Sequence, residues 1–228
     1  MSNILNVKNL SVELGGEEVL SDLTFNIKEK DNLMIVGPNG AGKSVLIHAL
    51  LGLVKYKGEI KWKKGIKISY IPQGFFPQKE IPLSVEEFFG FKKVNKEYIE
   101  KALFSVGLRD PLFLKKQVGL MSKGQFQRVM IAWSLVDGPD VLIFDEPTSG
   151  IDLGGEETIY NLLADMEKSI NLTIIIVTHD LSVVYKLADN VLCLNKKAVC
   201  YGAPQSILSS ESLKELYGGD IKVYHHVH

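Results

Sequence analysis

The chain has 228 residues, of which 46% are hydrophobic and 23% are charged. These fractions are ordinary for a globular protein and argue against a disordered, collagen-like or coiled-coil chain. The 26 basic and 27 acidic residues leave a net charge of −1, without the basic excess typical of a dedicated nucleic-acid-binding protein, so we expect no nucleic-acid partner.

The first sixty residues show two hydrophobic patterns. In residues 10–14 and 23–27 every second side chain is apolar, which predicts half-buried strands joined by a turn at Gly15-Gly16. Residues 33–36 instead form a continuous apolar run, which is typical of a strand buried on both faces.

In the last hundred residues, predicted strands alternate with a predicted helix. Buried runs occur at residues 141–144 and 174–177, and a helical pattern lies between them at residues 156–167. Alternating buried strands and helices predict an α/β fold with a largely parallel sheet.

The middle of the chain differs, because residues 84–106 and 124–136 have helical spacing with no buried-strand run between them. We therefore expect residues 74–135 to form a helical insertion and residues 1–73 with 136–228 to form the α/β core. The insertion is rich in aromatic side chains, which either form its own core or in part line a surface for a partner. Five phenylalanines, half of the ten in the chain, cluster near the start of the insertion: Phe75, Phe76, Phe88, Phe89 and Phe91.

Residues 37–44, Gly-Pro-Asn-Gly-Ala-Gly-Lys-Ser, match the phosphate-loop pattern G-x-x-x-x-G-K-[ST]. The motif follows a predicted buried strand and opens a predicted helix that begins at Gly42, which is the context it requires. Its glycines let backbone N–H groups surround a phosphate, and the helix N-terminus adds a positive dipole end. We expect Lys43 to reach the terminal phosphates of a nucleoside triphosphate and Ser44 to ligate Mg²⁺.

Two acidic residues and a histidine follow the later buried strands. Asp145 and Glu146 end the run 141–144, and the carboxyl ends of buried parallel strands face the ligand crevice. We expect Asp145 to hold Mg²⁺ and Glu146 to orient or deprotonate the attacking water. His179 follows the run 174–177 and is expected to reach the γ-phosphate.

Taken in order, these motifs resemble the ATP-binding subunits of ABC transporters over essentially the whole chain. The matching segments are residues 37–44 for the Walker A loop, Tyr70–Gln73 for the Q-loop, Met121–Gln125 for the signature motif, Leu142–Glu146 for Walker B, Ser149–Asp152 for the D-loop and His179 for the H-loop. The signature motif discriminates, because most other phosphate-loop ATPases lack it.

The resemblance implies a RecA-like phosphate-loop core with an N-terminal antiparallel β subdomain and a helical insertion. It implies ATP and Mg²⁺ as cofactors, with Glu146, His179 and Gln73 in catalytic roles and Ser44, Gln73 and Asp145 around the Mg²⁺ ion. The implied nucleotide-binding residues are Gly37, Pro38, Asn39, Gly40, Ala41, Gly42, Lys43, Ser44, Val45, Asp145, Ser122, Gly124 and Gln125.

The resemblance also implies partners. Two copies would form a head-to-tail homodimer around two ATP molecules, with Ser122 and Gly124 of one copy binding the γ-phosphate held by the other. Hydrolysis would move an integral-membrane permease docked on the helical insertion, and a substrate-binding protein would act indirectly. No stretch approaches the ~20 apolar residues of a membrane span, so we expect a cytoplasmic chain held at the inner face of the cell membrane by the permease.

Three positions depart from the family pattern. Leu14 stands where the family usually stacks an aromatic residue on adenine, and Val45 stands where it usually has threonine. Lys123 replaces a glycine of the signature motif and either assists the partner's phosphates or points outward.

Among ABC transporters, the chain is similar to the ATPases of zinc and manganese uptake systems. The similarity rests on residues 70–85, on the paired segments around Cys193 and Cys200, and on a histidine-rich end. It implies import of a divalent metal ion, zinc in the first place, with manganese, an iron complex or a non-transport role as alternatives.

The histidine-rich end allows two interpretations. His225, His226 and His228 lie close enough in sequence to share one Zn²⁺ ion, or they belong to a disordered polar terminus. The two cysteines also remain open. If Lys196-Lys197 form a two-residue turn, Cys193 and Cys200 face each other on a hairpin. We expect a buried, reduced pair in a reducing compartment, with a metal site as the alternative.

Overall fold

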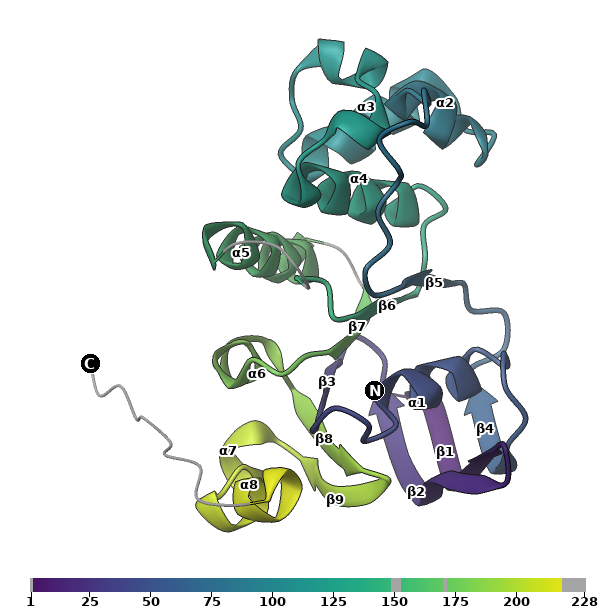
Figure 1. Cartoon of the computed structure of the whole chain (residues 1–228), viewed down its shortest axis with the longest axis vertical. Coiled ribbons are helices and arrows are strands. Elements are labelled where there is room, and N and C mark those ends of the chain that lie inside the picture. The colour runs from purple at the N-terminus through teal and green to yellow at the C-terminus, as the bar shows by residue number, and fades with distance from the viewer. Residues whose placement is uncertain (1, 149–152, 170–171, 219–228) are drawn as a thin grey trace. The chain divides into compact units, whose positions relative to one another are not determined.

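The structure is a computed structural model that describes residues 2–148, 153–169 and 172–218. The chain folds as two compact units, Met1–Gly65 with Thr173–His228, and Ile66–Leu172. Strands and helices occur in both units (Figure 1), which confirms the α/β class. The sequence predicts a different division, with residues 74–135 as a helical insertion in a core of residues 1–73 and 136–228. This division stays a prediction.

The first unit begins with an antiparallel sheet in the order β2-β1-β4. Its strands are β1 (Asn3–Leu14), β2 (Glu17–Lys28) and β4 (Lys57–Trp62). β1 and β2 form the predicted hairpin around Gly15-Gly16. Both strands begin six or more residues before the predicted windows, since alternation marks only their most regular part, and β4 was not predicted.

The remaining strands of this unit lie in the order β7-β3-β8-β9, with β7, β3 and β8 parallel and β9 antiparallel. They are β3 (Asn32–Val36), β7 (Thr173–Val177), β8 (Asn190–Asn195) and β9 (Lys197–Gly202). All residues of β3 and β7 are buried, as their continuous apolar runs predict. The helices of this unit are α1 (Lys43–Leu50), α6 (Leu181–Leu187), α7 (Pro204–Ile207) and α8 (Ser210–Tyr217).

The β8–β9 hairpin corrects the expectation for the two cysteines. Cys193 and Cys200 do pair across the strands, but the structure joins them as a disulfide rather than leaving a reduced pair. The turn also differs, because Asn195 pairs with Lys197 and a register shift follows Cys193. Lys196 alone forms the tip, in the left-handed region with φ 61°.

The second unit contains the parallel pair β5 (Ile68–Ile71) and β6 (Val141–Asp145). Its helices are α2 (Val85–Gly90), α3 (Lys96–Ser105), α4 (Lys123–Leu135) and α5 (Leu153–Ser169), with short 3₁₀ turns η1 (Pro111–Lys115) and η2 (Val118–Leu120). Within residues 74–135, all of which are described, no strand occurs and Ser84 and Gln117 form an isolated bridge.

The helical pattern of residues 84–106 is two helices rather than one. Ser84 begins α2 with a capping box to Glu87, and Asn95 begins α3 by accepting a hydrogen bond from the backbone N–H of Tyr98. Lys93, with φ 52°, interrupts the helical conformation between them. Periodicity does not detect this break, because the apolar spacing resumes after it.

An aromatic cluster packs around Phe126 of α4, which is 1% exposed. The rings of Phe75, Phe76 and Phe88 have centroids 6.0 to 6.2 Å from that of Phe126, the spacing of favourable aromatic pairs. Phe89 is fully buried, so it belongs to the core. Phe75 and Phe91 are 48% and 71% exposed, so the two hypotheses for these phenylalanines each describe part of the set.

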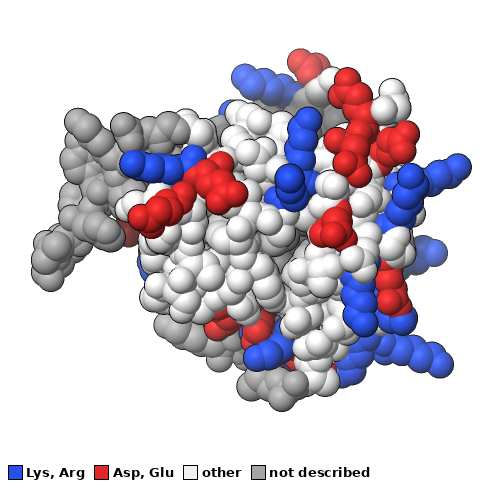
Figure 2. Space-filling model, turned by 90° about the horizontal axis from the view of Figure 1, so that it is seen from below, with Lys and Arg blue, Asp and Glu red and all other residues white. Residues whose placement is uncertain are grey.

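The surface carries mixed charge. Figure 2 shows Lys and Arg side chains interspersed with Asp and Glu on one face, beside a wide area that carries neither. On that face, basic and acidic side chains therefore lie close to one another. Among the helices of the described ranges, none has the length and apolar character needed to span a membrane.

We expect Phe89→Ala to lower the free energy of unfolding by about 3–5 kcal/mol, because truncation of a fully buried phenylalanine leaves a cavity. Phe91→Ala is the matched control, with an expected change within about 0.5 kcal/mol, because that side chain is mostly exposed. Urea denaturation followed by circular dichroism measures both. Equal losses for the two variants would contradict the burial difference.

Candidate functional site

The phosphate loop connects β3 to α1 and holds its lysine in place. Lys43 is 7% exposed, and its Nζ donates hydrogen bonds to the carbonyl oxygens of Gly37 at 2.8 Å and Pro38 at 3.0 Å. Gly42 is the N-cap of α1, no side chain of the described residues caps this end, and no acidic residue lies in the first turn. An uncapped N-terminus beside a buried ammonium group favours an anion.

Two glycines of the motif also satisfy local packing. A Cβ atom on Gly37 would lie 2.0 Å from the carbonyl oxygen of Leu194 in β8. A Cβ atom on Gly42, whose φ is 93°, would lie 2.5 Å from a methyl group of Leu20. Glycine is therefore required at both positions by neighbours in the same unit, independently of any ligand.

His179 follows β7 at the strand edge from which the phosphate loop also leaves. Ile35 of β3 pairs with Val177 of β7 in parallel register, and the N–H of Thr178 donates to the carbonyl of Ile35 at 3.1 Å. Asp180 caps α6 by accepting from the N–H of Ser182. His179 is exposed between two anchored residues, so its backbone is fixed while its ring faces solvent.

In the second unit, Gln73 and Glu146 come together at the carboxyl ends of β5 and β6. Ile71 pairs with Phe144, and Gln73 Nε2 donates to Glu146 Oε2 at 2.6 Å. Glu146 has φ 48°, in the left-handed region that is costly for a residue with a side chain. Backbone strain of this kind concentrates at functional sites.

Asp145 offers a carboxylate suited to a cation. It is 3% exposed, and its buried Oδ1 has no hydrogen-bond partner within the described part of the chain. Burial and the negative charge of Asp145 together raise the pKa of Tyr70 to about 12. An unpartnered, buried carboxylate oxygen is a ligand that Mg²⁺ prefers, so this residue fits the expected metal role.

The signature segment begins α4. Ser122 accepts a hydrogen bond from the N–H of Gln125 at 3.2 Å, and Gln125 Oε1 accepts from the N–H of Ser122. A Cβ atom on Gly124 would meet no other atom within 4 Å, so open space lies beside this residue. The ammonium group of Lys123 lies 5.3 Å from the ring centroid of Phe76, in a cation–π contact of the same unit.

Lys116 contacts a candidate site residue and was not singled out from the sequence. Its Nζ donates to Gln125 Oε1 at 2.7 Å, so the amide that caps Ser122 is itself held by a charged donor. Nothing in the local sequence signals this contact, because Lys116 follows the 3₁₀ turn η1 and reaches α4 only through the tertiary fold.

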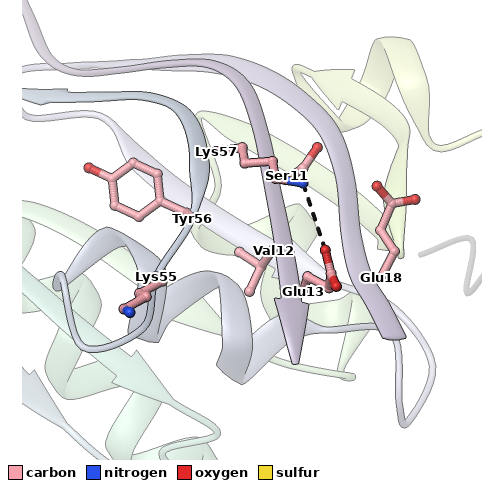
Figure 3. A pocket seen from close by; sticks show the side chains of 7 residues that line it. All are labelled: Ser11, Val12, Glu13, Glu18, Lys55, Tyr56 and Lys57. Atoms are coloured by element: carbon pink, nitrogen blue, oxygen red, sulfur yellow. Dashed lines mark ion pairs between the residues drawn. The ribbon is translucent and has the colours of Figure 1, made fainter. Parts of the chain in front are cut away.

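β1 ends at Leu14, the position where the family usually has an aromatic residue. Leu14 is 40% exposed, and the preceding Glu13 lines a pocket of about 260 Å³ together with Ser11, Val12, Glu18, Lys55, Tyr56 and Lys57 (Figure 3). Glu13 and Lys57 form an ion pair at 3.7 Å. This pocket offers one aromatic ring, from Tyr56, while position 14 offers an aliphatic side chain.

The predicted residues divide between the units. The phosphate loop, Val45 and His179 belong to the first unit, whereas Gln73, Ser122, Asp145 and Glu146 belong to the second. The D-loop, Ser149–Asp152, and the predicted zinc ligands His225, His226 and His228 lie outside the described residues. Among the residues that are described, no group of three or more His, Cys, Asp or Glu could hold a metal ion.

Comparison with known proteins agrees with this set of motifs. The ABC transporter family profile matches residues 20–149, which is more than half of the chain. The chain belongs to the ABC transporter family. It is 37% identical to the zinc import ATP-binding protein ZnuC of Wigglesworthia glossinidia brevipalpis, over 96% of this chain and 94% of that protein. It is 36% identical to a probable metal transport system ATP-binding protein of Thermotoga maritima, over 94% and 90%.

Solved ABC transporter structures have the same fold. One is a metal-chelate type ABC transporter in an inward-facing conformation, with a TM-score of 0.83 and 28% identity over 94% of this chain and 89% of that one. Another is CbiO1 of Clostridium perfringens, part of the transporter complex CbiONQ, with a TM-score of 0.79 and 30% identity over 94% of both chains.

Membership in the ABC transporter family establishes the general activity. The chain is an ATP-binding subunit with ATPase activity. ATP-binding subunits of ABC transporters work with membrane permease components.

We expect Lys116→Met to raise the KM for ATP about tenfold, because a charge-assisted hydrogen bond to Gln125 is lost. The matched control is Lys115→Met, which removes a neighbouring exposed lysine and should leave KM unchanged. Steady-state ATPase assays across ATP concentrations measure both variants. A normal KM in Lys116→Met would show that the signature segment does not depend on this contact.

Proposed function

We propose that this chain hydrolyses ATP to power the import of zinc through a separate membrane permease. Zinc is proposed as the substrate because the chain is similar, over nearly its full length, to relatives named zinc import ATP-binding protein. The chemistry of the motifs carries the rest of the proposal.

In this proposal residues 37–44 and the backbone N–H of Val45 hold the ATP phosphates. The uncapped N-terminus of α1 and the buried ammonium group of Lys43 support this role, because both favour negative charge. Lys43 exchanges the carbonyl oxygens of Gly37 and Pro38 for phosphate oxygens when ATP binds.

Ser44, Gln73 and Asp145 hold the Mg²⁺ ion, and the supporting observation is that Oδ1 of Asp145 has no hydrogen-bond partner among the described residues. When bound, the ion neutralises phosphate charge and polarises the bond to be broken. Glu146 orients the attacking water and accepts its proton, and Gln73 fixes the Glu146 carboxylate by the hydrogen bond between them. His179 contacts the γ-phosphate from the exposed end of β7.

The signature residues Ser122, Gly124 and Gln125 serve a second copy of the chain. The N-terminus of the 13-residue helix α4 points positive charge toward an anion, and the open space beside Gly124 admits one. In a head-to-tail homodimer this anion is the γ-phosphate of the ATP held by the partner copy.

The transport partners follow from the same proposal. The chain sits on the cytoplasmic face of the cell membrane through its permease, and a substrate-binding protein delivers the metal ion from the other side. Phe75 and Phe91, both exposed, are candidates for the surface that meets the permease.

We expect Glu146→Gln to retain ATP binding, to lose turnover by about 100-fold or more and to accumulate as an ATP-bound dimer. The reason is that the amide cannot accept a proton from water. Glu157→Gln, on an exposed position of α5, is the matched control and should behave as wild type. Phosphate release and gel filtration with ATP measure these properties. A monomeric Glu146→Gln variant with normal hydrolysis would overturn the assignment.

The substrate is tested in source cells grown under metal limitation. We expect deletion of the gene to abolish high-affinity zinc accumulation, and the wild-type gene, but not Glu146→Gln, to restore it. Mass-spectrometric metal analysis of the cells measures zinc and manganese together. Loss of manganese alone would change the cargo and retain the mechanism, while no change in either would contradict a role in metal import.

A further inference from the structure

We propose that Cys193 and Cys200 form a reversible dithiol–disulfide site that controls how firmly the β8–β9 hairpin holds the phosphate loop, and thereby the affinity for ATP. The inference rests on the nucleotide-binding role proposed for residues 37–44. It adds a regulatory modification site that neither the family motifs nor the relatives' names supply.

The cysteines are placed for this chemistry by the strands. Cys193 of β8 and Cys200 of β9 are direct antiparallel partners, with Cα atoms 4.8 Å apart and a bond between their sulfur atoms. That separation lies within the range over which a disulfide forms without backbone movement. They are also the only two cysteines in the sequence, so no other thiol competes for either one.

The segment that the disulfide closes, residues 194–199, contacts the phosphate loop. The carbonyl of Leu194 occupies the space beside Gly37, where a Cβ atom would lie 2.0 Å from its oxygen. At the hairpin tip, the N–H of Lys196 donates to the carbonyl of Ala41 at 3.0 Å. The hairpin therefore touches both the start and the middle of the phosphate loop.

The hairpin tip is held on a second side as well. The carbonyl of Lys196 accepts from the N–H of Ser21 in β2 at 2.8 Å, and Lys196 itself adopts the left-handed φ of 61°. One residue in an unfavourable conformation thus joins β2 to the phosphate loop. A cross-strand bond close to this tip restricts its alternatives, because it removes conformations in which the two strands separate.

The two sulfurs differ in access. Cys193 is fully buried, whereas Cys200 is half-buried, so an external thiolate meets Cys200 first. A low-molecular-weight thiolate attacks the Cys200 sulfur, forms a mixed disulfide with it and releases the Cys193 thiolate, which takes up a proton. A second thiolate attacks the small-molecule sulfur, releasing Cys200 as a thiol and a low-molecular-weight disulfide. Two thiols are oxidised and the protein disulfide is reduced, and the reverse sequence reforms it.

Reduction removes the covalent closure of residues 194–199 and leaves their contacts with Gly37 and Ala41 held by backbone hydrogen bonds and packing alone. If the phosphate loop is less ordered before ATP binds, binding must fix its conformation. The conformational entropy lost in that step weakens the affinity for ATP. We therefore expect the reduced chain to bind ATP about fivefold more weakly than the oxidised chain, at the low end of typical coupling between sites.

The experiment uses the full chain, reduced with dithiothreitol or oxidised with glutathione disulfide, after removal of the reagents. Intact-mass spectrometry and thiol titration establish the state, and calorimetric titration with Mg²⁺ and ATP gives Kd. Cys200→Ser is the matched variant, because it removes the half-buried sulfur; it should bind ATP like the reduced wild type in both buffers. Wild type compared with itself keeps the test valid if that variant folds poorly.

Equal Kd values in the two verified states would overturn the inference, as would a glutathione adduct in place of the internal disulfide. Failure of the chain to bind ATP in either state would instead overturn the proposed role of residues 37–44. A Kd that changes with redox state in wild type but not in Cys200→Ser supports the site.

Discussion

The parallel pairing of β3 with β7 on one side and with β8 on the other is the constraint on which the nucleotide-binding unit depends. Every residue of β3 is buried, so the strand has no freedom to shift without exposing apolar side chains or breaking hydrogen bonds on both edges. The phosphate loop leaves the end of this strand, and His179 leaves the end of its neighbour. Their separation is therefore set by the sheet, and flexible loop residues do not determine it.

The second unit uses the same device with fewer strands. β5 and β6 run parallel, and their ends deliver Gln73 to Glu146 and bury Asp145 with an Oδ1 that lacks a hydrogen-bond partner in the described ranges. The aromatic cluster around Phe126 supports the helix that begins with the signature serine. The candidate site residues of this unit thus lie at the ends of strands and at the start of one helix, and apolar packing fixes the backbone that carries them.

Much of this was predictable, for identifiable reasons. The phosphate loop, the acidic pair at the end of β6 and the start of α4 are local patterns, in which a few adjacent residues specify both the backbone and the chemistry. Lys116, the space-filling role of Leu194 and the tip formed by Lys196 were not predictable, because each depends on a contact between segments distant in sequence. The oxidation state of the cysteine pair was predicted wrongly. The low cysteine content indicated a reducing compartment, whereas the register of β8 against β9 brings the two sulfur atoms together and the structure joins them.

The backbone at Glu146 has a consequence for how this position tolerates change over time. A left-handed conformation at a residue with a side chain costs on the order of 1–3 kcal/mol, which glycine would largely avoid and asparagine would reduce. Either residue would lower this backbone cost, although the hydrogen bond from Gln73 would be lost, and turnover is the main factor that favours the carboxylate. A lineage that kept the scaffold but lost the need for hydrolysis would drift at this position toward glycine or asparagine, leaving a more robust and inactive protein.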